Sequence, residues 1–340
     1  MPATKPFILF FNPIRHGTAF DESLSEVART EVVISKSRAG FCKDLEGKYK
    51  DITIIYRISA SGAVAGNFDA HFIQQLTLSC RFICHNGAGY DQIDPEACAK
   101  RGITLTYAPD AVTEATSDSA SWLLLGALRQ LNSSLGSLRA GNFKKGIDFG
   151  HDPQGKILGI LGMGSIGRAI KKRSDPFGLI TRYQNRRPVS EEDAAGAEHV
   201  SFDKLLAESD IISLNVPLNA HTRHFTGDAE IAKMNDGVVI VNTARGAVID
   251  EAAMAEALES GKIGAVGLDV YEKEPIINEK LVQQERALMV PHLGTHTTET
   301  LAKMEALAME NARRAVLGED LLSSFPEHIH TQPTKADSRV

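Results

Sequence analysis

The sequence predicts an α/β protein of two domains, each built on a doubly wound parallel sheet, with a cleft between them. Short apolar runs alternate with amphipathic stretches along most of the chain, a pattern typical of βα units. The length of 340 residues exceeds the ~250 residues beyond which a single core rarely grows. We therefore expect one domain from residues 1–108 plus 298–340 and a second from residues 109–297.

Composition narrows the class of protein. Hydrophobic residues make up 43% and charged residues 24%, as in ordinary globular proteins. The net charge of -6 gives no electrostatic reason to bind nucleic acid or an anionic membrane, and no apolar run is long enough to span a bilayer. The four cysteines form no C-x-x-C pair and no cluster with histidine, so we expect reduced buried thiols, no metal and a cytoplasmic protein. The ending Ser338-Arg339-Val340 only loosely resembles a peroxisomal address, and a polar tail is the preferred interpretation.

The first domain is expected to open with a series of strands separated by helices. Amphipathic stretches that separate the strands include Ala70–Leu76 and Pro95–Arg101. The expected strands are Phe7–Phe11, Glu31–Ile34, Ile52–Tyr56, Phe82–His85 and Thr104–Thr106.

A helix is expected from Thr113 to Leu131, with Thr113 as the N-cap and Glu114 in the first turn. Its apolar block Trp122–Leu125 predicts deep burial at a domain or subunit contact, and we expect a homodimer. Residues 132–153 are rich in Gly, Ser, Asn and Lys and are expected to form an irregular excursion.

A second series of strands and helices follows. A helix is expected over Glu251–Glu259, with Gly261 as its C-cap, and a long helix over Glu299–Leu317 is expected to return to the first domain. The strands of this series are expected at Lys156–Leu161, Ile180–Gln184, Ile211–Leu214, Val238–Val241, Ala265–Leu268 and Leu288–Val290.

The segment Gly162-Met163-Gly164-Ser165-Ile166-Gly167 is a G-x-G-x-x-G that closes one expected strand and opens the helix Ile166–Ser174. Gly162 permits a tight turn, Gly164 lets the backbone approach a pyrophosphate, and Gly167 lets helix and strand pack closely. The motif in this context predicts a Rossmann-like dinucleotide site; the alternative is a glycine turn with packing value only.

The next strand should end at the residue that reads the adenosine ribose. An acidic residue there binds the 2′-hydroxyl of NAD, whereas an arginine nearby accommodates the 2′-phosphate of NADP. Here Asn185-Arg186-Arg187 follows the strand, without a carboxylate and with two guanidinium groups suited to phosphate. We therefore expect NADPH/NADP in preference to NADH/NAD; the alternative is a solvated basic loop.

Three polar segments follow late strands: Asn242–Gly246, Gly267–Pro275 and Val290–Gly294. Ligands bind at such carboxyl ends in open α/β sheets. Together with Gly87-Ala88-Gly89-Tyr90-Asp91 and Val216-Pro217-Leu218, and in this order, they make residues 80–318 resemble the D-isomer-specific 2-hydroxyacid dehydrogenases.

The resemblance implies roles for individual residues. Arg245 would bind the substrate carboxylate and the 2-oxo oxygen, and His292 would exchange a proton with that oxygen. Glu274 would hold the imidazole and raise its pKa, and Asp269 would bind the nicotinamide carboxamide. The other implied cofactor contacts are Gly162, Met163, Gly164, Ser165, Ile166, Asn185, Arg186, Arg187, Val216, Pro217, Thr222, Thr243, Ala244 and Thr116, and the implied substrate contacts are Ser59, Ala60, Ala88 and Gly89, with Arg245 and His292. Each of these polar side chains alone has an ordinary alternative, such as a surface ion pair or a core histidine.

The implied function is NADPH-dependent reduction of a small 2-oxoacid to the D-2-hydroxyacid, nearest the glyoxylate/hydroxypyruvate reductase branch; the D preference rests on the resemblance. One alternative is a reductase for a bulkier aromatic or branched 2-oxoacid. Another is a non-catalytic, dinucleotide-sensing corepressor-like protein, because fold alone does not fix function. A third is a formate- or phosphite-type dehydrogenase, against whose formate branch the pairing of Glu274 with His292 counts.

Overall fold

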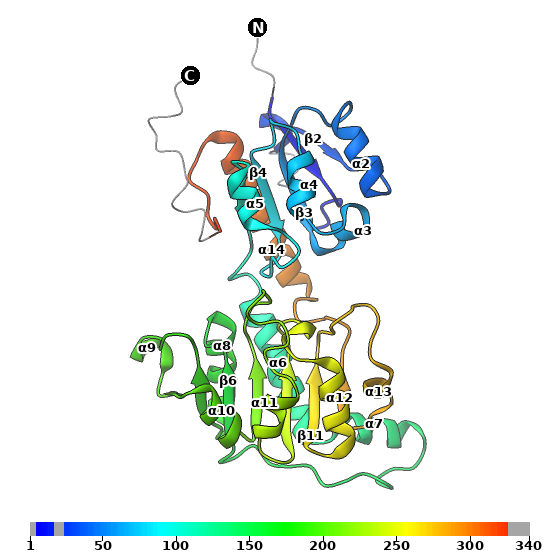
Figure 1. The fold of residues 1–340 in the computed structure, drawn as a ribbon, viewed down its shortest axis with the longest axis vertical. Coiled ribbons are helices and arrows are strands. Elements are labelled where there is room, and N and C mark those ends of the chain that lie inside the picture. Colours follow the sequence, from blue (N-terminus) through cyan, green and yellow to red (C-terminus); the bar gives the residue numbers. More distant parts are fainter. Residues whose placement is uncertain (1–4, 17–23, 326–340) are drawn as a thin grey trace. The chain divides into compact units, whose positions relative to one another are not determined.

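The computed structural model describes residues 5–16 and 24–325, so Ser338-Arg339-Val340 lies outside the described residues. The chain divides into two compact units, which we call unit 1 (residues 1–112 and 297–340) and unit 2 (residues 113–296). Each unit contains one parallel sheet with helices on its faces (Figure 1), which confirms the predicted fold class.

Unit 1 contains a five-stranded sheet of order β2-β1-β3-β4-β5, in which all pairs are parallel. Its strands are β1 (Phe7–Phe10), β2 (Arg29–Val32), β3 (Ile52–Ile58), β4 (Phe82–Asn86) and β5 (Thr104–Thr106). The strand expected at Glu31–Ile34 begins two residues earlier, because β2 pairs with β1 and the pairing ends where β1 ends, at Phe10 and Val32.

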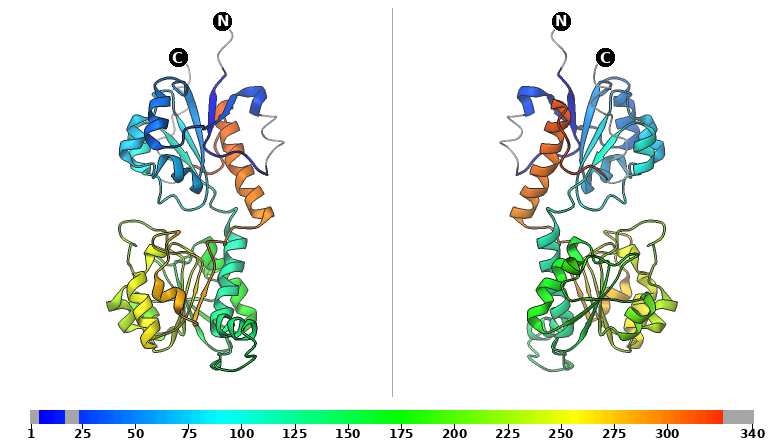
Figure 2. Two further views of the ribbon diagram at one scale, coloured as in Figure 1. Left: turned by 90° about the vertical axis from the view of Figure 1, so that its right-hand side faces the viewer. Right: turned by 90° about the vertical axis from the view of Figure 1, so that its left-hand side faces the viewer.

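Helices cover both faces of this sheet. On one face lie the short helices α2 (Arg38–Leu45), α3 (Gly62–Ala65), α4 (Ala70–Gln75) and α5 (Pro95–Lys100), which share an aromatic core that includes Phe41, Phe68 and Phe72. On the other face α14 (Thr298–Leu317) packs Met309 and Ala312 against β3 and β4 (Figure 2). The 3₁₀ turn η1 (Ser59–Ser61) connects β3 to α3.

Unit 2 contains a seven-stranded sheet of order β12-β11-β10-β9-β6-β7-β8, again with all pairs parallel. The first strand of this sheet, β6, lies inside it. The chain then runs through β7 to β8 at one edge, returns to β9 beside β6, and continues to β12 at the other edge. Its strands are β6 (Ile157–Leu161), β7 (Ile180–Gln184), β8 (Glu198–His199), β9 (Ile211–Leu214), β10 (Val238–Asn242), β11 (Ile263–Leu268) and β12 (Ala287–Met289).

The helices of unit 2 form two layers, visible on either side of its sheet in Figure 2. One layer holds α6 (Thr113–Leu128) and α8 (Ser165–Ser174), and the other holds α10 (Phe202–Glu208), α11 (Asp228–Lys233) and α12 (Glu251–Ser260). Shorter elements complete the unit: α7 (Leu131–Arg139), α9 (Glu191–Ala194), α13 (Glu279–Gln283) and the 3₁₀ turns η2 (Asp175–Phe177) and η3 (Gly246–Val248).

The helix that begins at Thr113 is shorter than expected, and the stretch that follows it is partly helical. The helix ends at Leu128, because Gln130 adopts a left-handed backbone (φ 55°), and α7 (Leu131–Arg139) covers the beginning of the stretch expected to be irregular. Of the block Trp122–Leu125, only Leu123 and Leu124 are buried, and Trp122 is 46% exposed. Successive helical residues point about 100° apart, so four in a row cannot all face the sheet.

Three further observations bear on the class of protein. None of the helices that the structure describes is both long and apolar enough to cross a membrane. Within residues 5–16 and 24–325, no three His, Cys, Asp or Glu side chains gather in a group that could hold a metal ion. The four cysteines are free thiols, of which Cys80, Cys84 and Cys98 are buried.

Candidate active site and dinucleotide-binding site

The carboxyl ends of the unit 2 strands bring the predicted residues of this unit to one edge of the sheet. β6 and β9 are neighbours whose following connections run to opposite sides, which is the point where open α/β sheets bind ligands. A pocket of about 830 Å³ opens there, within the ~300–1,000 Å³ usual for small-molecule sites. It is lined by Gly162, Gly164, Gln184, Asn185, Arg186, Arg187, Asn215, Val216, Pro217, Asn219, His221, Thr222 and Phe225.

The glycine turn between β6 and α8 is tightly packed at two glycines and open at the third. Gly162 has φ 101°, and a Cβ there would lie 2.8 Å from the carbonyl carbon of Asn215. A Cβ at Gly167 would lie 2.3 Å from the oxygen of Gly162, whereas a Cβ at Gly164 would meet nothing within 4 Å. No side chain caps α8 at Gly164. Its first N–H groups, in the turn with Ser165 and Ile166, therefore fit the pyrophosphate of a dinucleotide.

Asn185 holds this turn through its side chain. Its Oδ1 accepts a hydrogen bond from the backbone N–H of Met163 at 2.7 Å, and its backbone oxygen lies 3.2 Å from Nε2 of His199. Met163 itself has a fully buried side chain, so only its backbone lies at the turn. The position that reads the ribose in NAD-binding proteins thus carries a neutral amide whose oxygen is already engaged.

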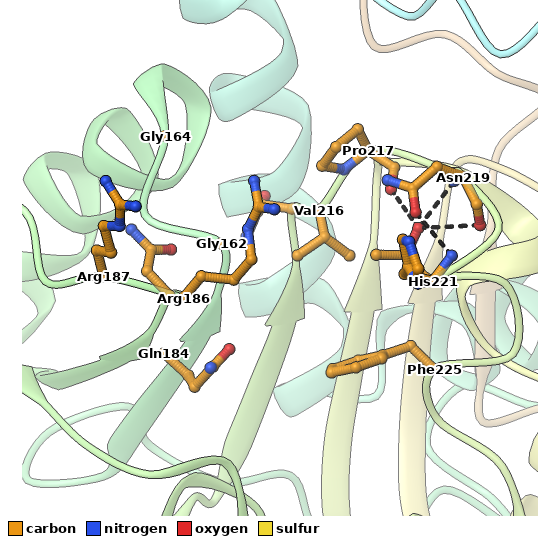
Figure 3. Close-up of a pocket in the computed structure, with 13 residues that line it drawn as sticks. Gly162, Gly164, Gln184, Arg186, Arg187, Val216, Pro217, Asn219, His221 and Phe225 are labelled. Carbon is orange, nitrogen blue, oxygen red and sulfur yellow. Dashed lines mark hydrogen bonds between the residues drawn. The ribbon is translucent and has the colours of Figure 1, made fainter.

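The two arginines that follow Asn185 stand at the pocket and are exposed. Figure 3 shows Arg186 and Arg187 rising from the end of β7, with the turn that contains Asn219 and His221 across the pocket from them. Neither arginine forms an ion pair with any residue that the structure describes. Their charges are therefore not neutralised by a carboxylate of unit 2.

The opposite wall of the pocket is a rigid turn. The N–H of Asn219 donates to Oγ1 of Thr222 at 2.8 Å, the N–H of His221 donates to Oδ1 of Asn219 at 2.8 Å, and the Thr222 hydroxyl donates to the oxygen of Pro217. Five lining residues were not predicted from the sequence: Gln184, Asn215, Asn219, His221 and Phe225. Gln184 is the last residue of β7, and Asn215 directly follows β9. Both are next to predicted residues, so their position at strand ends could have identified them.

Further along the same edge, His292 and Glu274 form the hydrogen-bonded pair expected of a catalytic dyad. Nδ1–H of His292 donates to Oε2 of Glu274 at 2.8 Å, and Oε1 of Glu274 accepts the backbone N–H of Tyr271 at 2.9 Å. The side chains of His292 and Glu274 are 46% and 36% exposed, so both are partly open to solvent.

Arg245 joins this pair from the end of β10. Gly246 packs so closely on the next strand connection that a Cβ there would lie 1.9 Å from the carbonyl carbon of Tyr271. The side chain of Asn242 stabilises the turn by two hydrogen bonds of 3.0 Å. Its Oδ1 accepts the N–H of Ala244, and its Nδ2 donates to the backbone oxygen of Arg245. These contacts fix Thr243, Ala244 and Arg245 beside the segment that carries Glu274.

The electrostatics of the pair favour a protonated imidazole. The hydrogen bond to Glu274 raises the pKa of His292 above its ordinary value, against the opposing effects of burial and of the nearby Arg245 charge. Burial alone would raise the pKa of Glu274, but its hydrogen bonds from His292 and Tyr271 bring that pKa below its ordinary value. A protonated His292 can donate a proton, whereas Glu274 remains ionised.

Asp269 supports the turn on which His292 sits. Its carboxylate accepts the backbone N–H groups of Leu293 and Gly294, and His292 itself has a left-handed backbone (φ 55°). A Cβ at Gly294 would lie 2.8 Å from Oδ2 of Asp269 and 3.7 Å from the Thr116 side chain. Asp269 and Thr116 of α6 therefore lie beside the turn that carries His292.

The predicted substrate contacts of unit 1 follow two neighbouring strands of its sheet. Ser59 and Ala60 lie in η1, directly after β3, and are exposed; Ala88 and Gly89 come after β4 and are half-buried. Because parallel strands end at the same edge, both segments lie at the carboxyl edge of this sheet.

Comparisons with known proteins agree with this geometry. The family model for the D-isomer specific 2-hydroxyacid dehydrogenase, NAD binding domain, matches residues 121–294. The chain is 46% identical to 4-methyl-2-oxopentanoate reductase A of Aspergillus oryzae, over 95% of this chain and 98% of that one.

Two solved structures extend the comparison. A glyoxylate reductase from Paecilomyes thermophila has a TM-score of 0.93 and 46% identity, over 96% of this chain and 100% of that one. An NADPH-dependent glyoxylate/hydroxypyruvate reductase from Sinorhizobium meliloti, in complex with NADP and malonate, has a TM-score of 0.83 and 26% identity, over 95% and 98%. This chain belongs to the D-isomer-specific 2-hydroxyacid dehydrogenases, and it is an enzyme of the 2-oxoacid reductase type.

The pairing of His292 with Glu274 generates a testable prediction. In Glu274→Gln the imidazole loses a charged acceptor, so burial and the Arg245 charge dominate and the pKa of His292 should fall. An NMR titration of the His292 ring measures this directly, without turnover. Glu272→Gln is the matched control, because Glu272 pairs with Arg223 and His224 and should leave His292 unchanged. An unchanged pKa in Glu274→Gln would contradict the assignment of the pair.

Proposed function

We propose that this protein uses NADPH to reduce a small 2-oxoacid to the D-2-hydroxyacid, with His292 as the general acid and base. The observation that carries the proposal is the hydrogen bond between His292 and Glu274 beside Arg245, at the same sheet edge as the dinucleotide pocket. The D preference follows from family membership.

The role proposed for each side chain follows from its charge and from the hydrogen-bonding groups that it can offer to a substrate. When bound, NADPH supplies the hydride that reduces the 2-carbon. Arg245 binds the substrate carboxylate and polarises the 2-oxo oxygen with its guanidinium fork. Nε2–H of His292 donates a proton to that oxygen, since Nδ1–H is held by Glu274. The neutral imidazole then regains a proton from solvent, to which its side chain is 46% exposed. In the reverse direction it accepts the hydroxyl proton.

The preference for NADPH is proposed from Asn185, Arg186 and Arg187. A 2′-phosphate carries a negative charge that two guanidinium groups can bind in a bidentate manner. Asn185 brings no carboxylate to repel that phosphate, and its oxygen is occupied by Met163 N–H. The NADPH-dependent Sinorhizobium meliloti relative supports the same preference.

The remaining cofactor contacts are proposed along the pocket and toward His292. Gly162, Gly164, Ser165 and Ile166 would hold the pyrophosphate, and Val216, Pro217 and Thr222 line the pocket beyond it. Thr116, Thr243, Ala244 and Asp269 would contact the nicotinamide end. The carboxylate oxygens of Asp269 each accept one backbone N–H and retain a lone pair for a carboxamide N–H.

The substrate is proposed to be glyoxylate or hydroxypyruvate, and a branched 2-oxoacid is the second candidate. The glyoxylate reductase structure and the 4-methyl-2-oxopentanoate reductase are each 46% identical to this chain, so identity does not separate them. Ser59 and Ala60 are small and exposed, which leaves space for a 2-substituent. Ala88 and Gly89 would offer backbone N–H groups to the carboxylate.

A homodimer is proposed from the exposed apolar side chains of α6, α7 and the loop that follows them, which together we call the α6–α7 face. Large apolar side chains are exposed here: Trp122 46%, Leu135 41%, Leu138 58%, Phe143 69% and Phe149 98%. Exposed apolar side chains gathered in one segment mark interaction sites, and a second copy is the simplest symmetric partner.

We also propose roles for the two domains and a location for the protein. Residues 109–297 bind the dinucleotide, and residues 1–108 plus 298–340 bind the substrate. The free thiols fit a cytoplasmic protein.

The reaction is tested by initial rates with glyoxylate, hydroxypyruvate and 4-methyl-2-oxopentanoate, each with NADPH and with NADH. We expect NADPH oxidation with at least one of them. His292→Asn should lower kcat by about 10²–10⁴-fold, because the proton donor is lost. His296→Asn, on the exposed segment four residues further on, is the control and should keep the wild-type rate. No turnover with any small or bulkier 2-oxoacid would favour a binding protein instead.

The cofactor assignment is tested by fluorescence titration of NADPH and NADH. Arg186→Gln with Arg187→Gln should raise the Kd for NADPH at least about tenfold, since each hydrogen bond to a charged group is worth ~1.5–3 kcal/mol. The Kd for NADH should change little. Asn185→Asp keeps the acceptor for Met163 N–H but adds a negative charge, so it should weaken NADPH and spare NADH. Wild-type protein that binds NADH as tightly as NADPH would contradict the assignment.

The homodimer is tested by light scattering during size-exclusion chromatography. Wild-type protein should elute as a dimer, and Leu138→Glu with Phe143→Glu should give a monomer, because charges would be buried in the interface. Phe177→Glu, an exposed apolar residue outside the α6–α7 face, should leave the dimer intact. A monomeric wild type would refute the proposal.

A further inference from the structure

Arg57 is a buried cation at the carboxyl end of β3 in unit 1, with 0% of its surface exposed. Its guanidinium lies 5.0 Å from the centre of the Phe68 ring, and Nη2 donates to Oε1 of Gln92 at 2.7 Å. Nε and Nη1 are also buried, without a hydrogen-bond partner among the residues that the structure describes. Burial lowers the pKa of Arg57 to about 10, partly offset by Asp91, so the side chain stays charged at neutral pH.

This arrangement is unfavourable for stability. A buried charge with two unpaired donors loses its hydration without full compensation, and apolar residues of similar volume are often as stable or more stable at such positions. Unsatisfied buried groups of this kind call for a functional explanation.

Arg57 and His85 hold two points of one loop. They are paired residues of the neighbouring strands β3 and β4, so their side chains share a face of the sheet. His85 Nε2 lies 2.9 Å from the backbone oxygen of Gly89, and Arg57 binds the side chain of Gln92. The loop also packs tightly on His85, because a Cβ at Gly87 would lie 2.6 Å from its Nε2. We call residues Gly87–Gln92 the anchored loop.

We propose that Arg57 is a positioning residue for the 2-oxoacid: through Gln92, and together with His85 at Gly89, it fixes the anchored loop that receives the substrate carboxylate. This inference rests on the proposed function, which places Ala88 and Gly89 at that carboxylate. Burying the cation costs stability, and in return the loop is held in a fixed geometry.

The test is Arg57→Met, which keeps an unbranched side chain that reaches about as far as Nε and removes the charge and the donors. We expect the KM for the 2-oxoacid to rise about tenfold or more, because a displaced binding loop is costly. The Kd for NADPH, which binds unit 2, should stay unchanged, and the melting temperature should stay equal or rise. Amide hydrogen exchange of residues 87–92 should become faster. Arg57→Lys, with the charge but without the planar fork, should fall between Arg57→Met and wild type.

Two further variants sharpen the test. Gln92→Ala removes the same hydrogen bond from the other side, so the effects of Arg57→Met and Gln92→Ala on kcat/KM should be non-additive in the double variant. Arg101→Met is the matched control: Arg101 Nη2 donates to the oxygen of Leu76 at 2.7 Å, at the end of α5, and its loss should leave the KM within twofold.

The outcomes separate this inference from the proposed function. If wild-type protein reduces a 2-oxoacid and Arg57→Met leaves its KM and the exchange of residues 87–92 unchanged, the inference is overturned. A lower melting temperature with equal losses in kcat and NADPH affinity would show a merely structural role and overturn it as well. If wild-type protein reduces no 2-oxoacid, the proposed function fails, and unchanged exchange in Arg57→Met or Gln92→Ala would still reject the anchoring of the loop.

Discussion

The parallel direction of all strands is the constraint on which the rest of this structure depends. In a parallel sheet every strand ends at the same edge, so residues that are far apart in sequence arrive side by side. In unit 2 the ends of β6, β7 and β9 form the pocket, and the ends of β10, β11 and β12 bring together Arg245, Asp269 and His292. Unit 1 uses the same constraint at the ends of β3 and β4.

Polar side chains at these edges form hydrogen bonds with the backbone of neighbouring loops. The side chain of Asn185 accepts the Met163 N–H of the glycine turn, and the carboxylate of Asp269 accepts two N–H groups of the turn after His292. Glycines then allow the close approach, as Gly246 does against Tyr271. Each functional loop is therefore fixed by a short polar contact from a neighbouring strand end, which limits the reorganisation needed when a ligand binds.

Charge is distributed unevenly between the functional groups. His292 has a carboxylate partner, which keeps its proton available, whereas Arg186 and Arg187 have no carboxylate partner among the described residues. A paired imidazole suits proton exchange, and unpaired guanidinium groups suit an anionic ligand. The buried guanidinium of Arg57 differs from both, because it donates one hydrogen bond to Gln92 while its other buried donors have no partner among the described residues.

The sequence by itself determined the two parallel sheets, the glycine turn and the candidate residues Arg245, Glu274 and His292, because strand periodicity and contiguous motifs are local signals. The motif order also identified the family. Only the tertiary structure decided what depends on contacts between distant segments: the end of α6 at Leu128, the exposure of Trp122, and the Asn219–Thr222 wall of the pocket. In the sequence, nothing distinguishes Arg57 from an ordinary charged surface residue. Its burial and its hydrogen bond to Gln92 depend on two neighbouring strands and a loop, so no local sequence pattern predicts them.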